Sequence, residues 1–92
     1  MMNKVKYIVF DSGDVVIFSA TIDHSTMRNT GRGNPAGAGF LHFFISDTVE
    51  GGKRNAHVSV MCYGESVSLK LKSREKLDEE KVNQYVLNNH LR

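Results

Sequence analysis

Four histidines are the side chains of this chain that most often bind metals or transfer protons: His24, His42, His57 and His90. No two of them have the spacing of a metal-ligand pair. In the strand register derived below, His42 and His57 lie on one face of neighbouring strands but four rows apart, too far to share an ion. We therefore expect ordinary surface or half-buried histidines, and the sequence predicts no metal site.

A hydrolase is a second possibility, because Asp23-His24-Ser25 contains the residue types of a catalytic triad. Residues that are adjacent in the chain cannot adopt the relay geometry of a triad. The single cysteine, Cys62, falls on the predicted core face, where a free thiol packs as a small hydrophobe. The pattern therefore predicts neither a catalytic residue nor a cofactor.

The segment YIVFDSGDVVI, residues 7–17, looks like the first motif of haloacid-dehalogenase-type phosphatases, an apolar strand followed by Asp-x-Asp. In that chemistry the first Asp attacks phosphorus and the second handles the proton. Here Gly13 stands two residues after Asp11, and Asp14 comes one position too late. The chain is also too short for a doubly wound domain, so we interpret 11–13 as a hairpin turn.

The loop SATIDHSTMRNTGRGNPAGA, residues 19–38, shows no regular pattern. Loops of this length in small domains tend to be functional or disordered. It is locally basic, with Arg28 and Arg32 and no acidic residue from His24 to Ser46. Its glycine-rich part lacks the lysine of a phosphate-binding loop and leads into a strand instead of a helix. We expect a short helical turn at 23–28, capped by Asp23 or Ser25. In the free protein, 24–38 should be the backbone least protected from hydrogen exchange, unless a partner orders it.

The elements that position these residues are predicted mainly as hairpins. HVSVMCYGESVSLKL, residues 57–71, has the period of two that marks half-buried strands. A turn at Gly64-Glu65 would place Tyr63 opposite Ser66, with Cys62, Val60 and Val58 opposite Val67, Leu69 and Leu71. A second turn, Gly51-Gly52 between Glu50 and Lys53, pairs Ile45 with Val58, Phe43 with Val60 and Leu41 with Cys62. Both registers choose the same core face, which predicts a three-strand meander.

Two further elements flank the meander. Val5 to Phe10 and Asp14 to Phe18 form a hairpin whose three-residue loop ends in a bulge at Gly13 and pairs Phe10 with Asp14. After Leu71 the period changes to that of a helix, from about 75–79 to 88–91, capped by Ser73 or Asp78. Its apolar stripe contains Leu77, Val82, Tyr85, Val86 and Asn89. The predicted fold is a single α+β domain, 1–92, of about five mostly antiparallel strands with a C-terminal helix packed on the sheet.

The other face of the meander carries an unusual number of aromatic residues. Its members are Phe40, His42, Phe44, Met61, Tyr63, Ser66, Ser68 and Lys70. Burial within the monomer, a subunit interface and a binding groove, including one that stacks nucleic-acid bases, are all open. One helix covers only one face, and the first hairpin is apolar on both sides. We therefore expect the hairpin to fold over this face and a two-fold dimer to cover the remainder, weakened by Phe44→Glu or Phe40→Glu.

Composition limits the partners and the cellular compartment that we expect for this chain. The chain has 92 residues, 40% of them hydrophobic, a net charge of +2 and one cysteine. The charge alone does not imply binding to nucleic acid. A single cysteine cannot form a disulfide within the chain, so the fold needs no oxidising compartment. No apolar run approaches the roughly 20 residues of a membrane span. The basic and then apolar N-terminus is interrupted by Asp11 and Asp14, so we expect a first strand instead of a signal peptide and a cytoplasmic protein.

Two motifs carry a resemblance. VIFSATIDH, residues 16–24, and CYGESVSL, residues 62–69, with Ser73 beyond, make the chain resemble small uncharacterised bacterial proteins encoded by phage and by mobile integron gene cassettes. The resemblance covers about half the chain and implies no activity or site residue.

The function expected from the sequence is a noncatalytic binding or interaction module, a homodimer with a possible small-molecule or protein partner. Its candidate binding residues are His24, Arg28, Arg32, Phe40, His42, Phe44, Met61 and Tyr63. One alternative is a small enzyme at the 20–38 loop that uses His24, Asp23 and Arg28. Another is a nucleic-acid-binding protein that combines the aromatic face with the basic loop.

Overall fold

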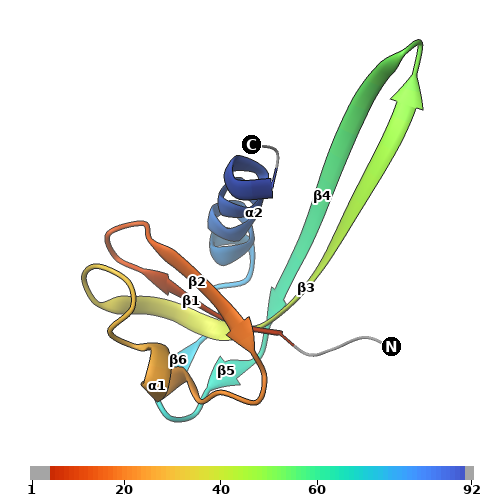
Figure 1. The fold of residues 1–92 in the computed structure, drawn as a ribbon. Coiled ribbons are helices and arrows are strands. Elements are labelled where there is room, and N and C mark those ends of the chain that lie inside the picture. Colours follow the sequence, from red (N-terminus) through yellow and green to blue (C-terminus); the bar gives the residue numbers. More distant parts are fainter. Residues whose placement is uncertain (1–4, 91–92) are drawn as a thin grey trace.

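The computed structural model describes residues 5–90, and for 43–48, 50, 54–58 and 90 it describes the backbone alone. The described chain forms a four-stranded antiparallel sheet, a short two-stranded hairpin and two helices (Figure 1), which confirms the α+β class. The elements are β1 (Val5–Phe10), β2 (Val15–Ser19), α1 (His24–Met27), β3 (Pro35–Glu50), β4 (Lys53–Tyr63), β5 (Glu65–Ser66), β6 (Leu71–Lys72) and α2 (Lys76–His90).

The first hairpin has the predicted register. The Phe10 N–H donates to the Asp14 carbonyl at 2.9 Å, and the Gly13 N–H donates to the Phe10 carbonyl at 2.9 Å. Gly13 has φ +96°, the conformation of a glycine bulge. The loop therefore has three residues, and this geometry keeps Asp11 and Asp14 from facing each other as a like-charge pair.

The β3–β4 hairpin also matches its prediction. Gly51 and Gly52 both have positive φ, +57° and +80°, as a two-residue type I′ turn requires. The pairing runs without interruption from Glu50 opposite Lys53 to Phe40 opposite Tyr63. The predicted pairs Leu41–Cys62, Phe43–Val60 and Ile45–Val58 are therefore confirmed.

The third strand of the meander is where the prediction is wrong. Gly64-Glu65 is not a two-residue turn, and β4 has no partner on its outer edge among the described strands. Glu65 and Ser66 form the short strand β5, which pairs with β6 through Glu65–Lys72 and Ser66–Leu71. The predicted register of Val60 with Leu69 therefore does not exist.

The Ser66 side chain explains why the third strand does not form. Ser66 Oγ accepts a hydrogen bond from the Leu69 N–H at 3.2 Å, and the Lys70 N–H donates to the Val67 carbonyl at 3.2 Å. Such local side-chain bonds offer the backbone an alternative to a strand ladder. Ser66, expected to lie in a half-buried strand, instead starts a turn over 67–70.

The first hairpin lies edge to edge with β3, which corrects the expectation that it folds over the sheet. The strand order is β2-β1-β3-β4, and β1 pairs with β3 from Val5–Leu41 to Phe10–Pro35. As the central strand, β1 is buried on both faces, and Tyr7, Ile8 and Phe10 are almost fully enclosed. Its apolar residues on both sides are thus covered within the monomer.

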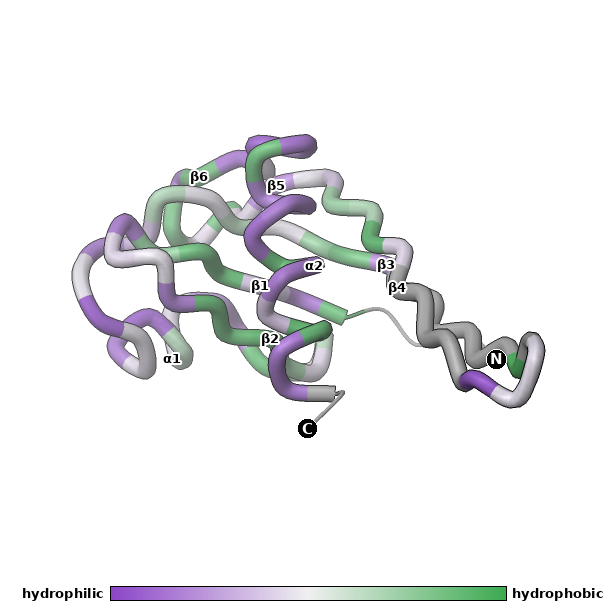
Figure 2. The backbone as a smooth tube through the Cα atoms, turned by 90° about the horizontal axis from the view of Figure 1, so that it is seen from above, coloured by the Kyte–Doolittle hydropathy of each residue, from purple (hydrophilic) through white to green (hydrophobic). Residues whose placement is uncertain are grey.

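Two cores sandwich this sheet. On one face, α2 contributes Val82 and Val86 to a cluster with Tyr7, Val9, Val15, Leu41 and Cys62. On the other face, α1 and the β5–β6 hairpin cover Ile8, Phe10, Phe18 and Ala38 with Ile22, Met27, Leu69 and Leu71. Figure 1 shows α2 on one side of the sheet and α1 with β5 and β6 on the other. In Figure 2 the hydrophobic segments of β1 and β2 lie beneath α2.

Helix α2 forms where predicted; both residues proposed as caps accept hydrogen bonds from the backbone just before it, although neither occupies the position directly before Lys76. Ser73 Oγ accepts from the Glu75 N–H at 3.1 Å, and Asp78 Oδ2 accepts from the Arg74 N–H at 2.8 Å. The buried stripe is Asp78, Val82 and Val86, spaced four residues apart. Leu77 and Tyr85 were assigned to this stripe, but their side chains are exposed, because the hydrogen bonds of Asp78 fix the rotation of the helix.

The long loop is more ordered than its composition indicates. Helix α1 confirms the helical turn, although the Asp23 side chain makes no capping hydrogen bond. Strand β3 begins at Pro35, and Gly37 and Ala38 pair with β1, so the irregular part ends at residue 34. Residues 35–38, assigned to the loop from the sequence, therefore belong to β3. Neither helix in the described part of the chain is long and apolar enough to cross a membrane.

The β3–β4 hairpin continues far beyond the rest of the sheet. The last β1–β3 pair is Val5 with Leu41, whereas the β3–β4 pairs continue to Glu50 with Lys53. Residues 42–61, here called the arm, therefore project from the body of the protein, as Figure 1 shows. Within the arm, Met61 is 59% exposed and Val49 is also exposed.

Candidate functional site

The sheet face opposite α2 carries a row of four rings that leads from α1 to the root of the arm. His24 meets Phe40 edge-on at 6.2 Å between centroids. Phe40 stacks on Tyr63 at 5.9 Å, and Tyr63 stacks on His42 at 5.2 Å. The structure thus brings together four of the eight predicted binding residues, from α1, β3 and β4.

His24 is the innermost ring and is buried. Its Nε2 lies 3.0 Å from the Gly39 carbonyl, and because a carbonyl only accepts, Nε2 carries the proton. Burial lowers the pKa of His24, which favours the neutral ring. The ring also packs edge-on against Phe18 at 5.4 Å. This is the environment of a packed core histidine, and it does not suit a group that exchanges protons with a substrate.

At the outer end of the row, His42 and Tyr63 are half-buried. A hydrogen bond of 3.1 Å joins the Tyr63 hydroxyl and His42 Nε2, so each ring holds the other in place. Met61 follows on the same face and is exposed. Phe44 was predicted for this face as well, but its side chain lies outside the described residues. The predicted members of this face on β3 and β4 thus share it wherever their side chains are described, whereas Ser66, Ser68 and Lys70 belong to β5 and the 67–70 turn.

Described residues line two pockets on this face. The larger one, about 620 Å³, is here called the His24 pocket and carries charges of both signs. Its cation, Lys6, donates from Nζ to the Ile22 carbonyl at 2.9 Å and is therefore already engaged. Asp23 lies at the same pocket. The lining residues are Lys6, Asp23, His24, Phe40, Gly64, Glu65, Val67 and Ser68.

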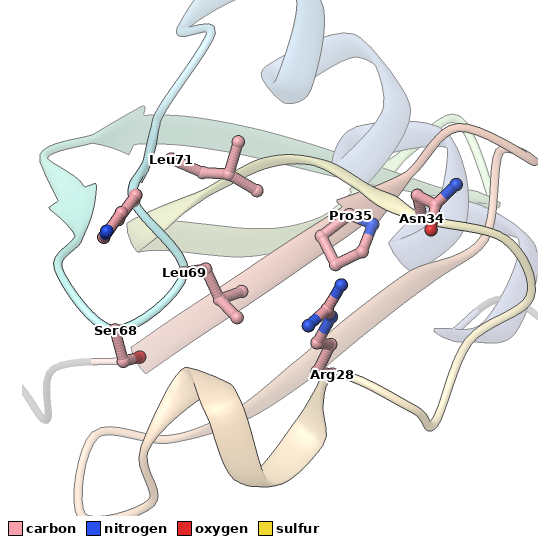
Figure 3. A pocket seen from close by; sticks show the side chains of 7 residues that line it. Arg28, Asn34, Pro35, Ser68, Leu69 and Leu71 are labelled. Carbon is pink, nitrogen blue, oxygen red and sulfur yellow. The ribbon is translucent and has the colours of Figure 1, made fainter.

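The smaller pocket, about 320 Å³, is here called the Arg28 pocket and lies between the end of α1 and the 67–70 turn (Figure 3). Its charged lining residues are both cations, Arg28 and Lys70. The remaining lining residues are Asn34, Pro35, Ser68, Leu69 and Leu71. Ser68 is shared with the His24 pocket, so the two pockets are neighbours.

Arg32, the other predicted basic residue, lines neither of these pockets. Its guanidinium forms a two-pronged ion pair with the Asp14 carboxylate, Nη2 to Oδ1 and Nε to Oδ2 at 3.1 Å each. The Arg32 backbone N–H adds a bond of 2.8 Å to the same carboxylate. These hydrogen bonds lower the pKa of Asp14. Arg32 therefore ties the loop to the first hairpin, and its charge is already balanced.

A buried polar network under α2 was not found from the sequence. The Tyr7 hydroxyl donates to Asp78 Oδ2 at 2.5 Å and lies 2.7 Å from Ser73 Oγ. Arg74 Nε donates to Asp78 Oδ1 at 2.8 Å. Burial raises the pKa of Tyr7, so the hydroxyl keeps its proton as a donor. The groups satisfy one another, which makes the network an anchor for α2. Its only sequence signal was the capping position of Asp78.

Cys62 adjoins this network. Burial raises the pKa of its thiol to about 12, with the carboxylates of Asp78 and Glu79 adding to the effect. A thiol with so high a pKa is a poor nucleophile at neutral pH. In the part of the chain that the structure describes, no three His, Cys, Asp or Glu side chains are grouped so that they could hold a metal ion.

Comparison with known proteins assigns no family. No protein-family model matches the chain, and no curated protein or solved structure shows significant similarity to it.

Proposed function

We propose that this protein is a noncatalytic binding module that works as a homodimer, with the arm as the contact between subunits. The observation that carries the proposal is that β3 and β4 extend past the last residue of β1. A hairpin that leaves its sheet exposes both faces and both edges, and a partner is the usual way to cover them.

The sequence of the arm supports this role. The register places Phe43, Ile45 and Val58 on the same face as Val60. The opposite face holds His42, Phe44 and Met61 near the root of the arm. A solvated hairpin would alternate apolar and polar residues, with one face in water. Apolar residues on both faces instead favour burial against another chain.

The edge of β4 adds a second argument. Near the body, the outward Cys62 N–H donates to Glu79 Oε2 of α2 at 3.0 Å, so the helix covers the end of this edge. Farther along the arm, no described strand pairs with the outer edge of β4. Open edges pair readily with other strands, and a two-fold axis would let the arms of two copies pair antiparallel.

The chemistry of the pockets supports a noncatalytic role. His24 and Asp23 were the candidates for proton transfer, but His24 is buried and bonded to Gly39. The rings of the aromatic row lie against one another, with His24 buried and the other three half-buried. Proteins that bind single strands instead offer open ring faces to successive bases. Binding of a protein partner or a small ligand therefore fits better than catalysis or nucleic-acid binding.

Sedimentation equilibrium from about 1 to 100 µM tests the dimer. We expect dimers at micromolar concentration. Met61→Glu should weaken association at least about tenfold, because the interface would bury an unpaired charge. The matched control is Leu77→Glu, since Leu77 is 61% exposed against 59% for Met61 but lies in the first turn of α2. An acidic residue there suits the helix dipole.

Two results would refute the arm as the interface. One is a wild-type monomer at 100 µM, and the other is equal weakening by Met61→Glu and Leu77→Glu. Phe44→Glu gives a second test on the arm. Phe40→Glu, suggested by the sequence, is unsuitable because Phe40 packs between His24 and Tyr63 within the subunit.

A further inference from the structure

We infer that the Arg28 pocket binds the phosphate group of a small phosphate monoester that carries an apolar body. The inference rests on the proposed role of the protein as a binding module, names the class of ligand, and does not depend on the dimer. Four features of the pocket lead to it: its charge, the backbone of Lys70, the three apolar side chains within its more polar lining, and its size.

The charge of the pocket is unbalanced. Within the described residues, neither the Arg28 nor the Lys70 side chain takes part in an ion pair or hydrogen bond. The contrast is with Arg32 and Arg74, which pair with Asp14 and Asp78. Two cations with no carboxylate among the lining residues attract an anion. A phosphate monoester carries a charge of about −1.5 to −2 at pH 7, which matches the pair better than a single carboxylate.

Lys70 adopts a backbone conformation that lysine seldom uses. Its φ is +54°, in the left-handed region where glycine or asparagine is preferred. The 67–70 turn would therefore form more readily with either of those residues. Neither can supply a cation, so the lysine places a positive charge at the pocket at the cost of a strained backbone.

The remaining walls suit the rest of such a ligand. Figure 3 shows the Arg28 side chain reaching from the end of α1 toward Pro35, with Leu69 across the pocket from it. Leu71 adds further apolar surface, and Ser68 and Asn34 contribute polar side chains. The volume of about 320 Å³ is at the small end of the range for ligand sites. Arg28 can present two parallel N–H donors to phosphate oxygens.

The test uses phenyl phosphate as the probe, with the full chain followed by isothermal titration and by amide NMR shifts. Phenylacetate and benzyl alcohol serve as matched probes with one charge and none. We expect phenyl phosphate to bind at least about tenfold more tightly than phenylacetate, and benzyl alcohol not to bind below about 10 mM. The shifted amides should lie in 28–35 and 66–71. Equal binding of phenyl phosphate and phenylacetate, or no binding at 10 mM, overturns the inference.

Variants locate the site. Lys70→Asn removes the cation at a position where asparagine tolerates the backbone better, so a loss of binding cannot be blamed on a damaged fold. We expect at least about tenfold weaker binding for Lys70→Asn and for Arg28→Gln. The control is Lys72→Asn, which changes the net charge equally two residues away and should alter affinity less than about twofold. Equal losses in Lys70→Asn and Lys72→Asn would overturn the assignment of the site.

Sedimentation of the same variants separates the two proposals. Lys70→Asn should dimerise like the wild type, because the Arg28 pocket lies on the body and not on the arm. A protein that dimerises without binding phenyl phosphate contradicts only the ligand inference. A monomer that binds phenyl phosphate contradicts only the dimer.

Discussion

Replacing Tyr7 with Phe removes one hydroxyl from beneath α2 and leaves the ring in the core. That hydroxyl donates to Asp78 Oδ2 at 2.5 Å, and both residues are fully buried. A hydrogen bond to an ionised group contributes about 1.5–3 kcal/mol. Asp78 keeps its two bonds from Arg74, so the carboxylate is not left unpaired. We therefore expect Tyr7→Phe to lower the free energy of unfolding by about 1.5–2 kcal/mol.

Such a loss is large for this chain, because small domains are stable by only about 5–15 kcal/mol. With a urea m value of about 1–1.5 kcal/mol/M, the midpoint should fall by about 1–2 M. Far-ultraviolet circular dichroism measures this urea midpoint. All variants are compared at one protein concentration, because association raises the apparent stability.

The control for this experiment is Tyr85→Phe, which removes a hydroxyl from α2 itself, at a residue that is 38% exposed. It should change the free energy of unfolding by less than about 0.5 kcal/mol. If Tyr7→Phe costs no more than Tyr85→Phe, the network does not anchor α2 and the reasoning is wrong.

Three further predictions concern the core. A Cβ on Gly39 would lie 2.5 Å from the Tyr63 carbonyl oxygen, so Gly39→Ala should cost about 1–3 kcal/mol, and an unchanged thermal midpoint would contradict this. The Cys62 thiol, with its pKa of about 12, should react with thiol reagents at pH 8 far more slowly in folded than in urea-unfolded protein, and equal rates would show it to be accessible. Burial holds the pKa of His24 below its ordinary 6.5, so the unfolded chain binds a proton at this residue more readily than the folded chain does. The free energy of unfolding should therefore be at its full value above about pH 6.5 and should fall as the pH drops below it. The fall should be smaller in His24→Gln.

The sequence predicts the parts of the fold that depend on neighbouring residues. Gly51-Gly52 favours a two-residue turn, and that turn alone fixes every β3–β4 pair that the structure shows. The loop ending at Gly13 fixes the first hairpin in the same way. Helix α2 begins and ends where its period and caps predict. Contacts within each of these elements join residues close in sequence, so local patterns suffice.

Contacts between elements were predicted less well. The pairing of β1 with β3 joins segments separated by the loop, and the sequence of neither strand indicates which strand it pairs with. The two apolar sides of β1 are those of a central strand, but the same pattern was read as a surface that needs a partner. The rotation of α2 depends on Asp78 and Tyr7, which are 71 residues apart in the chain.

In the candidate site too, the features set by local sequence were predicted, and those that combine distant segments were not. Alternation along β3 and β4 places Phe40, His42, Met61 and Tyr63 on one face, as predicted, because strand parity is a local property. The Arg28 pocket combines α1 with the 67–70 turn, and Lys70 was assigned to a strand that does not form. Only the basic character of the 24–38 loop pointed to Arg28.

Both proposals trace to the turn that replaces the missing strand. Had residues 66–71 paired with β4, the outer edge of β4 would be closed near the body, and Lys70 would lie in a regular strand. Instead Ser66 turns the chain back, so Leu69 and Leu71 cover the core beneath α1, and Lys70 and Arg28 line the same pocket. The edge of β4 is left open in the same step. One local competition between a serine hydroxyl and a strand ladder thus leaves open the edge that we propose pairs with a second copy, and forms the basic pocket that we propose binds a ligand.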